Sequence, residues 1–378
     1  MVFQQGFFQN YWSVVGEELT KSTRDFLNGG AILKETINTF ITLIPKKDNP
    51  KIVSEFRPIS LCNSRYKLAS KVIVNRLKPY LNSIIFPLQN GFIPGCSIND
   101  NISMALELTH TIRTSTAKKN GLAAIKIDMG KAFDRIDWEF LFNTLKKFKF
   151  PYHWIHLIKE CVSTVQYTLL VNGRTTKPFK PSCGLRQGDP LSHILFPLCT
   201  EALSASLSHL QSTNDIKGVS ITRNGLEISH LLFANDSYFF LHVNKTSIES
   251  LTNTLTSYGQ NSGQNIDFKK SQVFFNPKAS HSAKTFISNL LSIPSSSTFD
   301  FYLGIPLDID TKRNLIFEDF VDKIKKRINS WSSKFLNFGG KVTLIKSVLQ
   351  SILVYPMSIF KFPLSILNKI DKLFVDFL

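Results

Sequence analysis

Two aspartates stand where a β-sheet could bring their carboxylates together. Asp128 directly follows the apolar run 123–127, and Asp236 lies in the short polar link between the apolar runs 228–233 and 238–243. Two apolar runs joined by a tight polar link predict a hairpin. Carboxylates at a strand end and a neighbouring hairpin could hold Mg²⁺, which prefers oxygen ligands. Nucleotidyl transfer needs two such cations ~3.5–4 Å apart.

An aspartate at a strand end is, taken alone, more often a turn former, so the elements around it matter. Apolar residues at helical spacing predict helices over 11–28, 66–81, 101–116, 138–148, 317–328 and 341–353. Residues 40–44 predict a strand that ends at Pro45, and the Ser/Pro-rich segment 292–298 predicts a linker before a separate C-terminal unit.

The chain is strongly basic. Its 378 residues contain 45 Lys and Arg against 28 Asp and Glu, a net charge of +17. A basic excess of this size favours a polyanionic partner, either nucleic acid or a membrane surface, and nucleic acid is the preferred partner. The basic residues are spread along the chain, which a lined groove explains better than a disordered basic tail. No stretch reaches the ~18 apolar residues of a membrane span, and the first ten residues do not form a signal peptide.

Cysteine and histidine do not indicate a metal site. The five cysteines include no CxxC pair, so we predict neither zinc nor a disulfide framework, and we expect reduced, buried thiols at Cys62, Cys96, Cys161, Cys183 and Cys199. His153 and His156 could bind a metal together, but a third ligand is not close in sequence. We therefore predict a structural role for both.

Several segments follow one another in an order that resembles a known family. Early ones are Leu43-Ile44-Pro45-Lys46-Lys47, Phe56-Arg57-Pro58-Ile59-Ser60-Leu61-Cys62-Asn63, Tyr66-Lys67, Gln89-Asn90-Gly91-Phe92-Ile93-Pro94-Gly95 and Asp100-Asn101. Later ones are Asp128-Met129-Gly130-Lys131-Ala132-Phe133-Asp134-Arg135, Gly184-Leu185-Arg186-Gln187-Gly188-Asp189-Pro190-Leu191-Ser192, Phe233-Ala234-Asn235-Asp236, Ser262-Gly263, Lys270-Ser271 and Tyr302-Leu303-Gly304. The set resembles the reverse transcriptases of LINE-type (non-LTR) retrotransposons, plant ones especially. The resemblance covers almost the whole chain.

The resemblance implies a catalytic centre. Its members would be Asp128, Asn235, Asp236 and Lys270, with Mg²⁺ on Asp128 and Asp236. Lys270 would protonate the leaving pyrophosphate. The primer grip would be Tyr302, Leu303 and Gly304.

The resemblance also implies a nucleotide pocket. Phe133 would lie under the incoming sugar, where its ring excludes a 2′-hydroxyl and so favours dNTPs. Lys46 and Arg57 would hold the triphosphate, and Gln187 and Gly188 would line the pocket. The implied partners are an RNA template, a DNA primer and dNTPs. Asp134 and Asp137 are expected to stay outside the metal site, and Asp134 is expected to form a local salt bridge.

The sequence departs from the family pattern at a position that matters. The family's turn has aspartate where this chain has Asn235, and an amide oxygen supplies no negative charge to offset the repulsion of two cations. Cys96, His193 and Gly130 stand where the family usually has arginine, proline and serine. We therefore expect a copy that polymerises poorly or not at all.

The expected fold is α+β, a right-hand polymerase. Fingers with an N-terminal helix would take residues 1–120, the palm, an antiparallel sheet packed on helices, 121–310, and a truncated helical thumb 311–378. A full LINE product also has an endonuclease and often an RNase H region, which this sequence lacks, so a decaying fragment is expected. Two alternatives stay open: a catalytically dead nucleic-acid-binding protein with this fold, and an intron maturase-like splicing cofactor. The protein would be intracellular, and nuclear if the retroelement functions.

Overall fold

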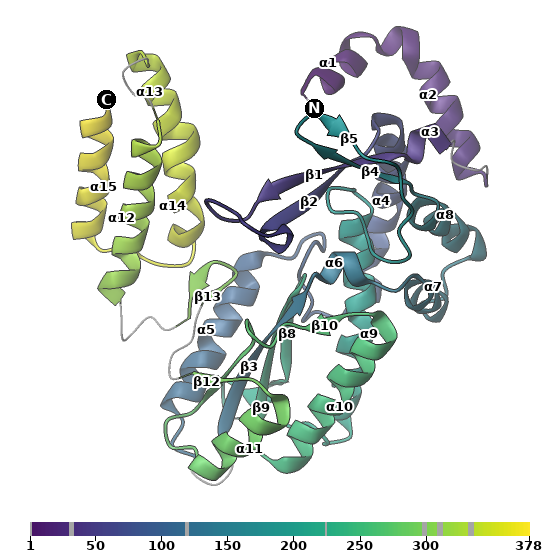
Figure 1. Ribbon diagram of the computed structural model, residues 1–378. Coiled ribbons are helices and arrows are strands. Elements are labelled where there is room, and N and C mark those ends of the chain that lie inside the picture. Colours follow the sequence, from purple (N-terminus) through teal and green to yellow (C-terminus); the bar gives the residue numbers. More distant parts are fainter. Residues whose placement is uncertain are drawn as a thin grey trace.

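The computed structural model describes residues 2–29, 34–117, 121–223, 225–296, 301–307, 313–331 and 336–378. Three regions are arranged around a common centre (Figure 1). A small sheet with N-terminal helices lies at the top, a larger sheet with its helices lies below, and a bundle of C-terminal helices stands to one side. The small-sheet region begins with α1 (Val2–Asn10), α2 (Trp12–Leu27) and α3 (Lys34–Ile37).

The small sheet draws on two distant parts of the chain. Its strand order is β2-β1-β4-β5, with β1 and β4 parallel and the other pairs antiparallel. The strands are β1 (Thr39–Pro45), β2 (Phe56–Leu61), β4 (Tyr167–Val171) and β5 (Arg174–Thr175), and the short helix η1 (Val53–Glu55) precedes β2. Residues 167–175, which lie within the range predicted for the palm, therefore complete the small sheet with β1 and β2.

The larger sheet carries both predicted carboxylates. Its order is β12-β11-β3-β9-β8, and β10 pairs with the far end of β3. The strands are β3 (Leu122–Gly130), β8 (His230–Phe233), β9 (Asp236–His242), β10 (Asn265–Ile266), β11 (Gln272–Phe275) and β12 (Ser295–Ser296). The pairings of β3 with β9 and β11, and of β8 with β9, are antiparallel, as predicted for the palm.

The predicted hairpin was wrong in its details. We expected strands 228–233 and 238–243 with a four-residue link, but β9 begins at Asp236, so the link contains only Ala234 and Asn235. Ile228 belongs to a separate strand, β7 (Glu227–Ile228), which pairs with β6 (Val219–Ser220). A polar residue can continue a strand when its backbone pairs, and Asp236 does so opposite Asp128.

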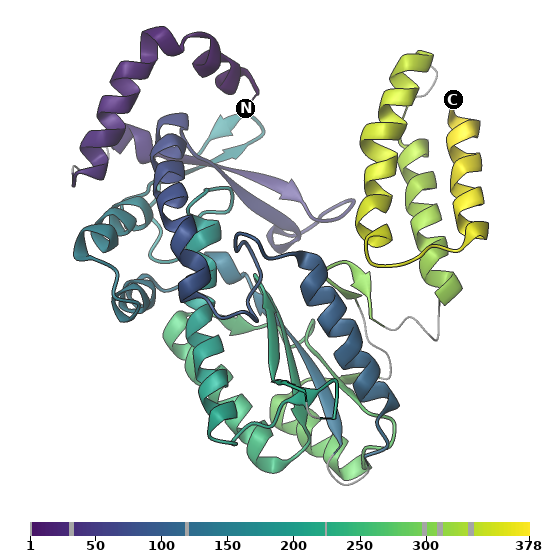
Figure 2. The ribbon, with the colours of Figure 1, turned by 180° about the vertical axis from the view of Figure 1, so that it is seen from behind.

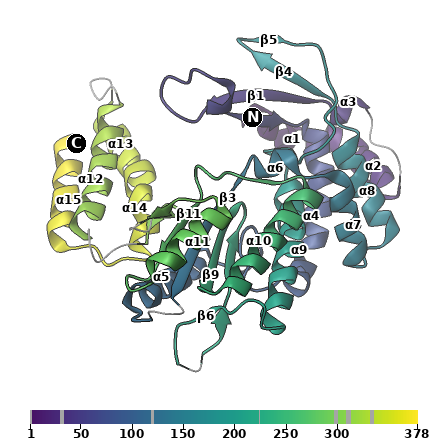
Figure 3. The same cartoon turned by 60° about the horizontal axis from the view of Figure 1, so that its bottom comes forward.

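The two faces of the larger sheet pack against different elements because side chains alternate along a strand. Ala123, Ile125 and Ile127 join the core formed with helices α9 (Ser192–Ser212), α10 (Lys245–Ser262) and α11 (His281–Leu291). Figure 3 shows α10 and α11 on this side of the sheet. Ala124, Tyr238 and Phe240 join the second core, with α5 (Ile98–Thr114). Lys126 and Asp128 follow Ala124 on the same face of β3, because they lie two and four residues further along the strand.

Most predicted helices are present with slightly different ends. The helix predicted over 66–81 is α4 (Ser64–Ile84), which begins where the Asn63 side chain accepts the Arg65 N–H. The helix predicted over 101–116 is α5, where Ser97 and Asp100 form a capping box. The 138–148 helix is α7 (Trp138–Lys147), capped by Asp137. The remaining helices of these regions are α6 (Ala132–Arg135) and α8 (Tyr152–Ser163).

The C-terminal helices form their own core. They are α12 (Arg313–Asn329), α13 (Phe338–Leu344), the π-helical turn η3 (Ile345–Leu349), α14 (Gln350–Met357) and α15 (Leu364–Phe377). Seen from behind, α5 lies between this bundle and the larger sheet (Figure 2). Asn99 at the start of α5 donates from Nδ2 to Ser358 Oγ over 3.1 Å, which links the bundle to α5. The boundaries predicted at 120 and 310 fall on residues outside the described part, and the division into fingers, palm and thumb stays a proposal.

Candidate active site

The two aspartates lie directly across from each other at one end of the larger sheet. Asp128 on β3 and Asp236 on β9 are register partners, and Asp236 is also opposite Phe233 on β8. Burial raises the pKa of the Asp236 carboxyl; the ammonium of Lys126 opposes this, and the nearby negative charge of Asp128 adds to it. Two carboxylates of like charge in partial burial provide the anionic oxygen donors that a divalent cation needs.

The tip of the turn is held by a neighbouring segment. Ala234 has a left-handed backbone (φ 52°), and a Cβ on Gly91 would lie 2.3 Å from Ala234 N. Only glycine permits that approach. The same segment pairs with β8, since Leu232 N donates to Leu88 O over 2.8 Å and Asn90 N donates to Leu232 O over 3.2 Å.

Asn101 connects the turn to the predicted primer grip. Its buried amide nitrogen donates both to Leu232 O and to the Tyr302 hydroxyl, each over 3.1 Å, and its amide oxygen accepts from Asn90. The sequence showed Asn90 and Asn101 only as parts of matching segments, without roles, whereas Tyr302 was a predicted primer-grip residue. Contacts between positions 201 residues apart could not be inferred from spacing.

The predicted primer grip is a compact hairpin. It consists of β13 (Phe301–Tyr302) and β14 (Ile305–Pro306), joined by Leu303 and Gly304, which both have positive φ. The Lys126 ammonium donates to Phe301 O over 2.7 Å, and the Tyr355 hydroxyl of α14 donates to Leu303 O over 2.8 Å. The hairpin is therefore attached to β3, the strand of Asp128, and to the C-terminal bundle.

Lys270 lies against the carboxylate of Asp128. Its Nζ is 3.3 Å from Asp128 Oδ2 and 3.2 Å from Asp267 Oδ2. Desolvation acts to lower the pKa of Lys270, but hydrogen bonds and charge from Asp267 and Asp128 outweigh it, and the pKa is raised. The group is a charged donor next to the site, as a proton donor to a leaving group must be. Asp267 had no predicted role.

The predicted nucleotide residues gather beside α6. The Phe133 ring stacks on Phe196 with centroids 4.5 Å apart, and Leu185 N donates to Phe133 O over 2.7 Å. Gln187 Nε2 donates to Asp134 Oδ1 over 2.9 Å. This corrects the expected local salt bridge of Asp134: among the described residues its carboxylate bonds to an amide, although Lys131 and Lys46 act on it through their charge.

The two predicted triphosphate ligands lie on the small sheet. Lys46 directly follows β1, where its N–H donates to Glu55 O over 2.8 Å and its Nζ donates to Ser54 O over 2.9 Å. Arg57 on β2 is exposed, opposite Ile44. Lys46 is close enough to Asp134 to lower the pKa of that carboxyl. Arg57 lies on β2, which pairs with β1, the strand that Lys46 follows.

The cysteines and histidines differ in part from expectation. Cys62, Cys161 and Cys199 are buried free thiols as predicted, but Cys96 and Cys183 are exposed because both lie in loops. His153 Nε2 is 2.8 Å from Leu27 O, a structural contact between α8 and α2. Within the described ranges, no group of three or more His, Cys, Asp or Glu side chains is placed to share one metal. None of the described helices is long and apolar enough to cross a membrane.

This fold and this pair of carboxylates define a polymerase palm, and comparison with known families agrees. Residues 44–307 match the family model described as reverse transcriptase (RNA-dependent DNA polymerase). The match spans well over half of the chain, which therefore belongs to the reverse transcriptase family. Members of this family generally use a divalent metal.

Relatives place the chain within that family. It is 25% identical to an uncharacterised 149 kDa protein of transposon TX1 from Xenopus laevis, over 98% of this chain and 28% of that protein. It is 30% identical to the polyprotein of the type-2 retrotransposable element R2DM from Drosophila melanogaster, over 43% of this chain and 15% of that protein. The chain is thus a reverse transcriptase domain of the LINE type, as predicted, and it spans less than a third of these relatives.

A solved structure supports the same fold. Telomerase from Candida tropicalis, determined with a fragment of telomeric RNA, aligns with a TM-score of 0.51 at 15% identity, over 90% of this chain and 56% of that one. At this identity the likeness concerns the fold alone. The α+β, right-hand polymerase architecture predicted from the sequence is confirmed.

Proposed function

We propose that this chain is a polymerase domain that adds dNTPs to a DNA primer on an RNA template, at a rate limited by Asn235. The observation that carries the proposal is the register of Asp128 opposite Asp236, one residue from the turn at Asn235. The primer hairpin is bonded to β3 through Lys126, and the segment 184–191 is bonded to Phe133 and Ile136, which follow β3 in the chain. These are the parts that template-directed nucleotidyl transfer needs.

Asp128 and Asp236 would hold Mg²⁺, which would supply positive charge to the reacting phosphate oxygens. The protein's own groups would orient the primer end and transfer the proton. The carbonyls of Phe301 and Leu303 are fixed by Lys126 and Tyr355, which orients the hairpin that would hold the primer end. Lys270, with its raised pKa, would carry a proton toward the pyrophosphate.

The remaining groups would select and bind the nucleotide. Phe133 is held by the stacked ring of Phe196 and would exclude a 2′-hydroxyl by steric contact. Lys46 and Arg57 would bind the triphosphate, and Gln187 and Gly188 would form the pocket wall.

Asn235 sets the expected level of activity. It is half of the two-residue link beside both aspartates, and its amide brings no negative charge to a site built to hold two cations. The repulsion between two divalent ions is then offset by two carboxylates only. We propose that this copy polymerises poorly or not at all.

A second candidate is a non-catalytic nucleic-acid-binding protein with the same fold. The net charge of +17 favours it as strongly as it favours the enzyme. A maturase-like splicing cofactor would share the fold as well, but no specific contact among the described residues favours it.

Primer extension on an RNA template separates the candidates. The Asn235→Asp variant is given a labelled DNA primer with either dNTPs or NTPs, and Asp128→Asn in the same background is the inactive control. Extension with dNTPs alone, lost in the control, supports the enzyme. Binding of primer–template that weakens steeply with salt, with no extension by Asn235→Asp, supports the binding protein. Absence of both rejects the two candidates.

A further inference from the structure

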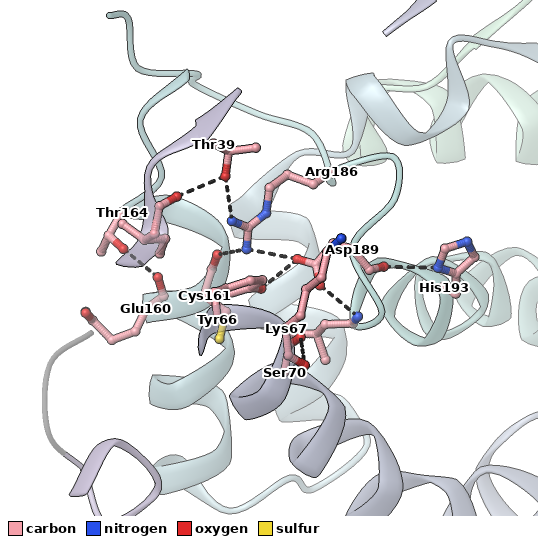
Figure 4. Close-up of polar contacts among 12 residues, drawn as sticks. Thr39, Tyr66, Lys67, Ser70, Glu160, Cys161, Thr164, Arg186, Asp189 and His193 are labelled. Carbon is pink, nitrogen blue, oxygen red and sulfur yellow. Dashed lines mark hydrogen bonds and ion pairs between the residues drawn. The ribbon is translucent and has the colours of Figure 1, made fainter. Parts of the chain in front are cut away.

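A buried charged network includes two residues of the segment 184–191, the predicted nucleotide loop, which carries Gln187 and Gly188 (Figure 4). The Arg186 guanidinium and the Asp189 carboxylate form an ion pair of 2.9 Å, and each side chain is only 3% exposed. Charged side chains are rarely this buried unless they have fixed partners. Neither residue was assigned to the proposed metal site or to the proposed nucleotide pocket.

Each member of the network has bonds to a different element. Tyr66 on α4 donates its hydroxyl to Asp189 Oδ2 over 2.6 Å, and Asp189 Oδ1 accepts the Leu191 N–H over 3.0 Å. Arg186 donates to Cys161 O on α8 over 2.8 Å and to Thr39 Oγ1 on β1 over 3.3 Å. The pair therefore fixes the loop between the small sheet and two helices.

Tyr66 supports both charges at once. The Arg186 guanidinium carbon lies 4.0 Å from the centroid of the Tyr66 ring, so the ring face contacts the cation while the hydroxyl binds the anion. Burial raises the pKa of Tyr66 well above its usual range, so the hydroxyl keeps its proton and stays a donor. The contact joins positions 123 residues apart.

The loop held in this way carries the residues that face the proposed nucleotide. Gln187 O accepts the Ser60 N–H over 2.8 Å, and Gly188 has φ 102° with a position for Cβ only 3.1 Å from Ser60 O. On its other side, Gly184 N donates to Ile136 O over 2.8 Å and Leu185 N donates to Phe133 O. The loop is thus bonded between β2 and the segment of the predicted sugar-contacting ring.

We propose that Tyr66 is a positioning residue for nucleotide binding: with Arg186 and Asp189 it fixes the backbone of residues 184–191, and thereby Gln187 and Gly188. Tyr66 does not touch the nucleotide. This proposal rests on the proposed function, because it assigns the loop to the dNTP. It predicts that loss of one hydroxyl loosens the loop and weakens dNTP use, while binding of primer–template is unaffected.

The test variant is Tyr66→Phe, which keeps the ring on Arg186 and removes only the hydroxyl. Its matched control is Tyr258→Phe. Tyr258 is also buried in the main core, and its hydroxyl donates to Cys199 O over 3.5 Å on α9, away from the loop. A general loss of packing would affect both variants, whereas a positioning role affects only Tyr66→Phe.

The first readout needs no activity. Amide hydrogen exchange of peptides covering 184–191 is compared with that of peptides covering β9 in the full chain. In Tyr66→Phe, the loop should exchange about tenfold faster, because a hydrogen bond to a charged group is lost, and exchange in β9 should be unchanged. Tyr258→Phe should leave the loop unchanged. Equal loop exchange in the two variants overturns the proposal.

The second readout is kinetic, in the Asn235→Asp background. Tyr66→Phe should raise the KM for dNTP about tenfold, keep kcat within about twofold and leave the Kd for primer–template unchanged. Faster loop exchange with an unchanged KM also overturns the proposal. If the Asn235→Asp parent itself does not extend a primer, the proposed function has failed, and the exchange comparison decides whether Tyr66 orders the loop.

Discussion

Two polar clusters of this protein differ in how their charges are paired. Around Arg186 and Asp189 the charges are buried and each has several partners: a tyrosine hydroxyl, backbone groups and the opposite charge. Around Asp128 and Asp236 two like charges face each other at the sheet end, and the adjacent link contributes the neutral Asn235. The first cluster is satisfied within the protein. In the second, Lys270 pairs with Asp128 and Lys126 acts on Asp236 through its charge, and we propose that Mg²⁺ would balance the two carboxylates.

The difference separates what maintains the fold from what performs chemistry. A buried ion pair that loses one partner leaves an uncompensated charge, so such a cluster must be kept for the protein to fold. We propose that the turn can change without that cost, because Asn235 is neutral and only partly buried. A chain of this family can therefore keep the right-hand architecture while one side chain limits its catalysis.

The largest effect on folding is expected at Arg186. Arg186→Met should lower the free energy of unfolding by about 3–5 kcal/mol, because Asp189 is left buried without its cation. Urea denaturation followed by circular dichroism measures it. The double variant Arg186→Met/Asp189→Leu should recover most of the loss. A single variant as stable as the parent would mean that the network does not hold the fold.

Glu201 sharpens the comparison, because it is a buried carboxyl with no cation paired to it among the described residues. It accepts the Phe86 N–H over 3.1 Å, and burial raises its pKa to about 7. The pKa of Glu201 is higher in the folded than in the unfolded protein. Its contribution to the free energy of unfolding is therefore greatest below about pH 4.5 and is lost as the pH rises toward 7.

Glu201→Gln should be more stable than the parent at pH 8 by up to about 3 kcal/mol, and nearly equal at pH 4.5. Gln keeps an oxygen for the Phe86 N–H and cannot ionise. Urea midpoints at both pH values measure the change. A difference that does not depend on pH would reject the raised pKa.

The smallest effect is expected at Lys126, at the border between sheet and primer hairpin. Lys126→Met removes the bond to Phe301 O and should raise the Kd for primer–template about fivefold, a modest value because the side chain is partly exposed. Lys71→Met, an exposed lysine on α4, is the control. Equal effects would show that only net charge matters.

The sequence predicted local elements well and long-range contacts poorly. The strand before Asp128 and the hairpin at Asn235 follow from apolar runs and a short polar link, and the family order of motifs placed them in one palm. Tyr66 with Asp189, and Asn101 with Tyr302, are joined across 123 and 201 residues. No periodicity reports such pairs, because their spacing depends on how the helices and sheets pack.

The hairpin also shows the limit of pattern reasoning at single residues. Asp236 appeared as part of a polar link, but its backbone pairs with Asp128 and extends β9. The addition of residues 167–175 to the small sheet was missed because β4 pairs in parallel with a strand more than a hundred residues earlier.

The most direct test of the account is the single-turnover rate of dNTP addition in Mg²⁺ by the native chain and by Asn235→Asp. Both are bound to the same DNA primer on an RNA template, so binding does not enter the comparison. The account predicts that Asn235→Asp is faster by ~10²–10⁴-fold, the effect of several kcal/mol of transition-state stabilisation at about tenfold per 1.36 kcal/mol. Equal rates would contradict it.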